Sequence, residues 1–150
     1  MPLVFVYGTL MRAGANHPVL TRLSGRFVAA ATTKAPRTLV DLGPYPALLP
    51  PDAAPAPTTL VAGELWEIDD SALRELDAFE GCPELYTRER VALVSGAGAE
   101  AAEVEAFVYV LAGRAPRSAR VIADGRYVAE GVGVPEGAQR RTGRRRRGGG

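Results

Sequence analysis

The sequence contains one cysteine, one histidine and no long hydrophobic run, and each shortage excludes a class of protein. Cys82 alone cannot form an intramolecular disulfide or a CxxC metal site. Because His17 is the only histidine, Ser-His-Asp and Cys-His catalysis would have to use it, and a zinc site is not expected. No stretch approaches about 18 consecutive apolar residues, and the N-terminus lacks the pattern of a signal peptide. We therefore expect a cytoplasmic protein with no membrane segment, no metal and no other cofactor.

Charge is unevenly distributed along the chain. The 18 basic and 17 acidic residues give a formal net charge of +1, but six arginines lie within residues 139–150, where there is no acid. The other 12 bases and 17 acids give the rest of the chain about −5. An acidic body with a separate basic tail does not favour a nucleic-acid groove; a tail that tethers nucleic acid or an acidic partner is the alternative. We expect one domain over residues 1–130 and a disordered Arg/Gly-rich tail over residues 131–150.

Residues 3–7 are five consecutive apolar or aromatic residues, which predicts a central strand that is buried on both faces. Gly8 then permits a tight turn and a close backbone approach, and Thr9 adds a hydroxyl group. A strand that ends at a glycine leaves main-chain N–H donors unpaired, and such donors suit a small anionic or carbonyl ligand. The GxxxxGK[ST] and GxGxxG patterns are absent, and an ordinary exit turn from a buried strand is the alternative.

Periodicity and turn residues predict the order of the other elements. They are, in chain order, a helix from about His17 to Leu23 capped by Asn16, strands over 26–33, 38–41 and 59–68, a helix over 71–80 capped by Asp69 or Asp70, a hairpin of strands over 86–95 and 103–111, an irregular segment over 114–123, and a short final strand over 124–128.

Two features break this regular pattern. Residues 43–57 contain six prolines, which predicts a loop, and within it the apolar residues 45–49 should pack onto the body of the protein. Gly63 lies in the middle of the strand expected over residues 59–68. A glycine at such a position indicates that another backbone or a side chain approaches closely.

The helix over residues 71–80 carries a carboxylate on its apolar side. At 100° per residue Glu80 falls within the arc of the apolar side chains, whereas Asp77 falls on the solvated face. Loss of hydration and the helix C-terminus at Gly81 would both raise the proton affinity of Glu80, which makes it a candidate base. In the alternative, the last turn frays and Glu80 faces water or pairs with Arg88 or Arg90.

Two stretches, VFVYGTLMRAGANHPVL at residues 4–20 and LDAFEGCPELYTRERV at residues 76–91, resemble the gamma-glutamylcyclotransferase superfamily. The closer likeness is to its gamma-glutamylamine cyclotransferase branch. The family pattern is YG[ST]L at the end of the first strand and an EG turn followed by an aromatic residue and an arginine. The matching residues are Tyr7, Gly8, Thr9 and Leu10, and then Glu80, Gly81, Pro83, Tyr86 and Arg88. The resemblance covers roughly residues 3–128.

The resemblance implies an α+β fold, a small mixed β-barrel flanked by short helices, with a cavity between the YGTL loop and the EG glutamate. It implies a gamma-glutamyl cyclotransferase without a cofactor, in which the alpha-amine of a small gamma-glutamyl substrate attacks its own gamma-carbonyl and releases 5-oxoproline with an amine or amino acid. Glu80 would transfer the protons. The substrate would be bound by Tyr7, Gly8, Thr9, Leu10, Tyr86 and Tyr109.

Other functions stay open at the level of the sequence. A module that binds a small molecule on the same fold without turnover is the main alternative, because fold does not fix function. Cys82 as the nucleophile of a thiol enzyme is a second. Where family members often close with a Gly-Asp-Trp-like stretch, this chain has Asp124, Gly125, Arg126 and Tyr127, so the far wall of the pocket is not defined by the family pattern. The sequence determines neither the leaving group nor the oligomeric state.

Overall fold

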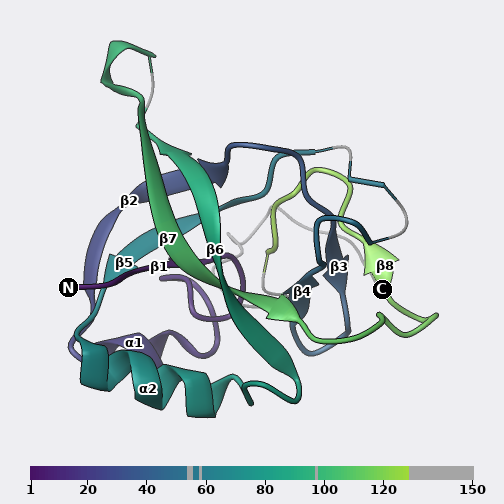
Figure 1. The fold of residues 1–150 in the computed structure, drawn as a ribbon, viewed down its shortest axis with the longest axis horizontal. Helices are drawn as coiled ribbons and strands as arrows, with labels where there is room; N and C mark the ends of the chain where they lie inside the picture. Colours follow the sequence, from purple (N-terminus) through teal and green to yellow (C-terminus); the bar gives the residue numbers. More distant parts are fainter. Residues whose placement is uncertain (54–55, 58, 97, 129–150) are drawn as a thin grey trace, which may run out of the picture.

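The first strand lies inside a closed sheet, as its run of apolar residues predicts. The computed structural model describes residues 1–53, 56–57, 59–96 and 98–128. In it, β1 (Leu3–Val6) pairs antiparallel with β5 (Ala62–Glu67) and parallel with β7 (Ala102–Leu111) (Figure 1). Val4 and Val6 belong to one apolar cluster and Phe5 to a second. The expectation of a central strand that is buried on both faces is therefore confirmed.

A barrel closes around this strand. The neighbours run in the order β1, β5, β2 (Arg26–Thr33), β6 (Tyr86–Ser95), β7, and the pairing of β7 with β1 completes the circle. Three short strands extend from β7: β4 (Pro46–Leu48), β3 (Leu39–Asp41) and β8 (Arg120–Val121). The expected α+β fold, a small mixed β-barrel flanked by short helices, is confirmed.

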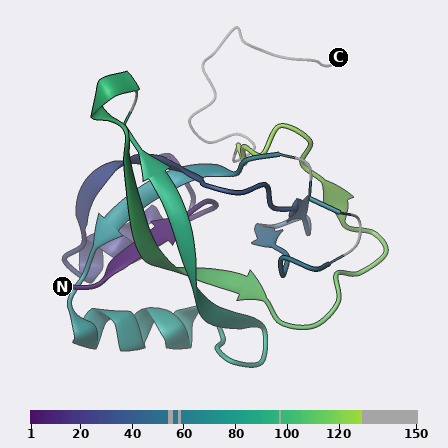
Figure 2. The same ribbon diagram turned by 45° about the horizontal axis from the view of Figure 1, so that its top comes forward.

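Two helices cover one side of the barrel, as Figures 1 and 2 show together. The buried side chains of α1 (His17–Arg22) and α2 (Asp70–Phe79) join the same apolar cluster as Val4 and Val6. The long β6–β7 hairpin, with the short helix η1 (Gly98–Glu100) in its connection, projects away from them. Neither helix of the described residues has the length and apolarity to cross a membrane.

The proline-rich segment is more ordered than expected. Residues 43–57 were predicted to be a loop, but Pro46–Leu48 form β4, which pairs with β3 and β7. Proline is compatible with a strand at its first residue, and that is where Pro46 lies. The prediction that the apolar residues 45–49 pack onto the body is confirmed, since residues 46–49 are buried.

The end of the domain also differs from the prediction. The last strand is β8, which lies within the segment expected to be irregular and pairs with β3. No strand forms over residues 124–128. Gly125 instead adopts φ +70 in a turn. Its N–H donates to Ile122 O at 3.1 Å, and its carbonyl oxygen accepts from Ala62 N at 2.9 Å. The tail expected over residues 131–150 lies outside the described residues.

Helix caps follow the sequence in one case and not in the other. Asp69 caps α2 as predicted, because its Oδ1 accepts from Ala72 N at 2.7 Å. Asn16 precedes α1 but makes no side-chain cap. Its Nδ2 donates instead to Thr9 Oγ1 at 3.0 Å, so the side chain holds the loop after β1 and not the helix.

Gly63 is the glycine on which closure of the barrel depends most directly. A Cβ at this position would lie 2.4 Å from Val6 O and 2.8 Å from the Phe5 ring. The predicted close approach of another segment is therefore confirmed, and that segment is β1. We expect Gly63→Ala to lower the free energy of unfolding by about 1–3 kcal/mol, measured by urea denaturation. Ala92→Ser, which adds one atom at an exposed position of β6, is the control. Equal stability of the two variants would contradict the steric argument.

Candidate active site

A cavity of about 170 Å³ opens where the loop after β1 faces the C-terminus of α2 and the start of β6. Every residue that the sequence singled out for the site lines it: Tyr7, Gly8, Thr9, Leu10, Glu80, Tyr86 and Tyr109. The lining residues that sequence reasoning did not assign to the site are Phe5, Val6, Asn16, Tyr45, Pro46, Phe79 and Leu85. Residues that are distant in the sequence therefore meet in one hollow.

The loop after β1 folds back on itself. Asn16 N donates to Thr9 O at 2.9 Å, Met11 N to Gly8 O at 3.1 Å, and the His17 Nδ1 atom lies 3.2 Å from Leu10 O. The carbonyl oxygens of all three lining residues of the loop are thus occupied. This pattern fixes the loop conformation without using the N–H groups of the same residues.

Those N–H groups have no hydrogen-bond partner in the described residues. Within the described part of the chain, no hydrogen bond is donated by the backbone N–H of Gly8, Thr9 or Leu10. Gly8 and Leu10 are buried, and a buried N–H without a partner is costly and rare. Consecutive free N–H groups form a concave donor site for an anion or a carbonyl oxygen.

Gly8 has a second, steric role. A Cβ on this residue would lie 2.6 Å from Cγ of Pro46, so β4 packs directly on the loop and only glycine fits between them. The strand β4, which the sequence analysis predicted to be part of a loop, therefore forms a wall of the cavity.

The loop is also tied to the barrel by a partly buried carboxylate. Glu64 on β5 accepts from the Arg12 backbone N and from Arg12 Nε, both at 3.1 Å, and from Trp66 Nε1 at 3.1 Å. The Arg12 guanidinium lies 3.7 Å from the centroid of the Phe27 ring. Arg12 is therefore a structural clamp of the loop.

Glu80 ends α2 and lies at the cavity. Its backbone N–H donates to Leu76 O at 2.9 Å, and Gly81 follows with φ +71, the usual conformation after a helix end. Among the described residues, its carboxylate has no hydrogen bond and no ion pair. Burial raises the pKa of Glu80 to about 7.

The alternative ion pairs of Glu80 do not form in the structure. Arg88 pairs with Asp77 at 2.8 Å, and Arg90 lies 3.4 Å from Glu105. The two arginines that could have held Glu80 as a carboxylate are thus both engaged elsewhere, and burial acts on Glu80 without a neighbouring cation.

Three tyrosines surround this carboxyl group, and each hydroxyl has a protein partner. Tyr7 Oη donates to Tyr109 O at 2.7 Å and accepts from Leu48 N at 3.0 Å. Tyr86 Oη donates to Pro46 O at 3.0 Å, and Tyr109 Oη donates to Asp77 Oδ1 at 2.7 Å. Burial first, and then nearby groups that include Glu80, raise the pKa of all three phenols, which keeps them neutral.

The helical wheel misplaced two side chains of α2. Asp77 was expected on the solvated face but is half-buried and accepts the Tyr109 proton. Phe79 falls within the apolar arc of the wheel but is 44% exposed at the rim of the cavity. The spacing could have placed Asp77 near the site, because residues three apart, such as Asp77 and Glu80, are neighbours on a helix surface.

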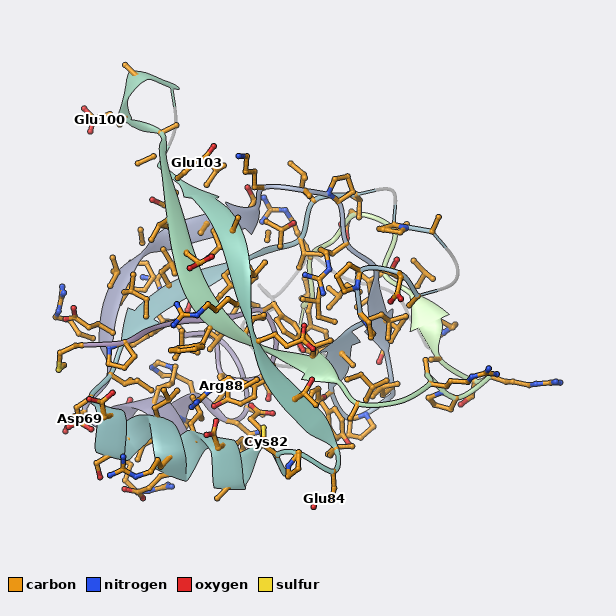
Figure 3. The ribbon with its side chains drawn as sticks, viewed as in Figure 1. Asp69, Cys82, Glu84, Arg88, Glu100 and Glu103 are labelled. Carbon is orange, nitrogen blue, oxygen red and sulfur yellow. The ribbon has the colours of Figure 1, made fainter. Side chains whose placement is uncertain are left out.

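Cys82 does not have the properties of a nucleophile. Burial, and after it the nearby carboxylates of Asp77 and Glu80, raise the pKa of its thiol to about 11. A reactive cysteine requires the opposite shift, because the thiolate is the nucleophile. Figure 3 shows Cys82 beside the end of α2, while Glu84 on the same turn points away from the molecule.

Comparisons with known proteins show the family to which the chain belongs. The family model described as gamma-glutamyl cyclotransferase, AIG2-like, matches residues 4–129. A gamma-glutamylaminecyclotransferase of Homo sapiens is 40% identical over 134 residues, which is 81% of this chain and 86% of the relative. The relative of the same name in Rattus norvegicus is 40% identical over 122 residues, 75% of this chain and 80% of its own length.

Solved structures show the same relationship. The crystal structure of an AIG2-like protein from Mus musculus superposes with a TM-score of 0.66 at 35% sequence identity, covering 77% of this chain and 80% of that one. Sequence and fold thus lead to one result: the chain is an enzyme that belongs to the gamma-glutamyl cyclotransferase, AIG2-like family.

Proposed function

We propose that this enzyme cyclises a gamma-glutamyl amine and releases 5-oxoproline. The alpha-amine attacks the gamma-carbonyl of the same molecule, the new C–N bond closes a five-membered lactam, and the old amide C–N bond breaks to free an amine. The observation that carries the proposal is a poorly hydrated carboxyl group, Glu80, in the same cavity as the free N–H groups of residues 8–10. The names of the relatives at 40% identity support the substrate class.

Such a reaction requires no protein nucleophile. Nucleophile and electrophile belong to one molecule, and a cavity that holds the glutamyl chain folded can supply about 7–11 kcal/mol of the barrier reduction. The unreactive thiol of Cys82 and the contact of His17 with Leu10 O agree with a mechanism that uses neither residue as a nucleophile. The protein has to supply a shape and a proton carrier.

Glu80 is the proton carrier in this mechanism. Transfer of a proton from an alpha-ammonium group with a pKa near ~8 to an ordinary glutamate near ~4.3 costs roughly 5 kcal/mol. With the pKa of Glu80 at about 7, the same transfer costs only about 1.4 kcal/mol. The protonated Glu80 can then give its proton to the departing nitrogen, so that one group acts as base and then as acid.

The loop and the rim would bind the two ends of the substrate. The N–H groups of Gly8, Thr9 and Leu10 suit the alpha-carboxylate or the oxygen that becomes negative in the transition state. At the mouth, Phe79 and Leu85 are 44% and 42% exposed and present apolar surface to the leaving amine. This surface favours an amine with an aliphatic or aromatic body.

Removing the proton carrier tests the mechanism directly. We expect Glu80→Gln to lower kcat for 5-oxoproline release by about 10²–10⁴-fold, because the amide keeps the shape but cannot accept a proton. Product is measured by chromatography with a panel of gamma-glutamyl amines. Glu84→Gln, an exposed carboxylate four residues away, is the control and should keep wild-type turnover. Wild-type turnover by Glu80→Gln would sink the assignment, and binding without product by the native enzyme would establish the non-catalytic alternative.

The pH dependence follows from the same group. Below its pKa Glu80 already carries a proton and cannot accept another, so kcat/KM should fall on the acid side with a midpoint near pH 7. The full rate profile is measured from pH 3.5 to 9 at constant ionic strength. A midpoint near pH 4.5 would mean that Glu80 titrates as an ordinary carboxyl group and that the argument from burial is wrong.

The buried carboxyl group should also cost stability. A carboxyl pKa raised from 4.5 to about 7 favours the protonated folded state, so this contribution is full below pH 4.5 and is lost as pH rises through 7. At pH 8 we therefore expect Glu80→Gln to be more stable than the native enzyme by up to about 3 kcal/mol, and the difference should vanish near pH 4. Urea denaturation at both pH values measures it, with Glu84→Gln as the control. A difference independent of pH would refute the linkage.

A further inference from the structure

The Tyr109 hydroxyl belongs to a cluster that extends from the cavity to the surface of α2. Its Oη donates to Asp77 Oδ1 at 2.7 Å, and Asp77 Oδ2 accepts from Arg88 Nη1 at 2.8 Å. Arg88 and Tyr109 are directly opposite each other on the β6–β7 ladder, so both side chains leave the sheet on the same face. Figure 3 shows Arg88 over α2, between the hairpin and the helix. The hairpin register therefore brings both groups to one carboxylate.

This cluster fixes the direction of a proton. A tyrosine hydroxyl has one proton to donate and lone pairs that accept, whereas an ionised carboxylate only accepts. Because Asp77 accepts, the Tyr109 proton points toward Asp77 and the oxygen keeps a free acceptor position. The Tyr86 proton is likewise spent on the carbonyl of Pro46. Neither hydroxyl has a proton left for a ligand.

The cavity is consequently divided by hydrogen-bond polarity. Glu80, Tyr86 and Tyr109 offer acceptors, and the loop over residues 8–10 offers N–H donors. A ligand that fits both sets carries an ammonium group and a carboxylate or carbonyl oxygen. An ammonium group has three N–H bonds, which acceptors such as Glu80, Tyr86 and Tyr109 can receive.

We propose that Asp77 is a positioning residue that, by accepting the Tyr109 proton, makes the Tyr109 oxygen an acceptor for the alpha-ammonium group of the substrate. This inference rests on the proposed function, because that function supplies the ammonium group. When Glu80 takes one proton, the two other N–H bonds stay with the tyrosine oxygens. Loss of that proton leaves on the nitrogen the lone pair that attacks the gamma-carbonyl carbon.

The test compares two ligands that differ only in the ammonium group. One is a gamma-glutamyl amine, and the other is the glutaryl amide of the same amine, which lacks the alpha-amino group and cannot cyclise. We expect Tyr109→Phe to raise KM for the first at least tenfold, with a Ki of the second within twofold of the wild-type value. A role in cavity shape alone would weaken both ligands together, and that result would overturn the proposal.

Asp77→Asn tests the positioning role separately from Tyr109. The amide of asparagine can donate to Tyr109 Oη and reverse the bond, so the same selective loss is expected. In the Tyr109→Phe background Asp77→Asn should add less than a twofold effect, because Asp77 acts only through the hydroxyl. Independent, multiplying effects would overturn the proposal. Glu75→Gln, an exposed carboxylate on α2, is the control, and melting temperatures confirm that each variant is folded.

Failure of the proposed function is visible in a different measurement. It would show as no 5-oxoproline from the wild-type enzyme with any gamma-glutamyl amine. The uncleaved ligand can then be titrated by calorimetry against its glutaryl counterpart. Loss of the preference for the ammonium ligand in both Tyr109→Phe and Asp77→Asn still supports the acceptor arrangement, and an unchanged preference rejects it.

Discussion

The site depends on a carboxyl group that the fold largely shields from water without giving it a cation. Glu80 closes α2 and lies in a cavity among neutral phenols, while the nearby arginines are engaged by Asp77 and Glu105. An ion pair would lower its pKa and leave a poor base. Full exposure would leave the pKa at the ordinary value of a glutamate, which also makes a poor base near neutral pH. Burial without a partner is the arrangement that raises the pKa of a glutamate to about 7, where it can both accept and release a proton near neutrality.

The opposite wall follows from a different constraint, the close contact between strands. Gly63 lets β5 lie against β1, and Gly8 lets β4 lie against the loop that follows β1. Each glycine is defined by what a single Cβ would meet, so these positions serve backbone approach. The folded loop uses its carbonyls internally, and this leaves the N–H groups of residues 8–10 for a ligand. Donor side and acceptor side thus arise from separate parts of the sequence.

Sequence patterns predicted the elements that are set locally. The run over residues 3–7, the period of α2 with its cap at Asp69, and the hairpin over β6 and β7 lie where their residues indicated. The pattern failed where long-range pairing decides: β4 forms although prolines surround it, because β3 and β7 supply its partners. Asp77 was misplaced for the same reason. A helical wheel separates polar from apolar faces, but it does not show that Tyr109 and Arg88 of the hairpin lie against the face that carries Asp77.

The neutral tyrosines explain how the cavity can be polar without being charged. Each hydroxyl gives its proton to a carbonyl or to Asp77, so the phenols add acceptor oxygens near Glu80 but no formal charge. A cation in their place would stabilise the Glu80 carboxylate and weaken it as a base, and an anion would raise its pKa so far that it stayed protonated. Hydrogen-bonded phenols avoid both effects. Asp77 lies close to this wall, and its pairing with Arg88 compensates its charge, which allows it to orient Tyr109 without adding a net charge to the site.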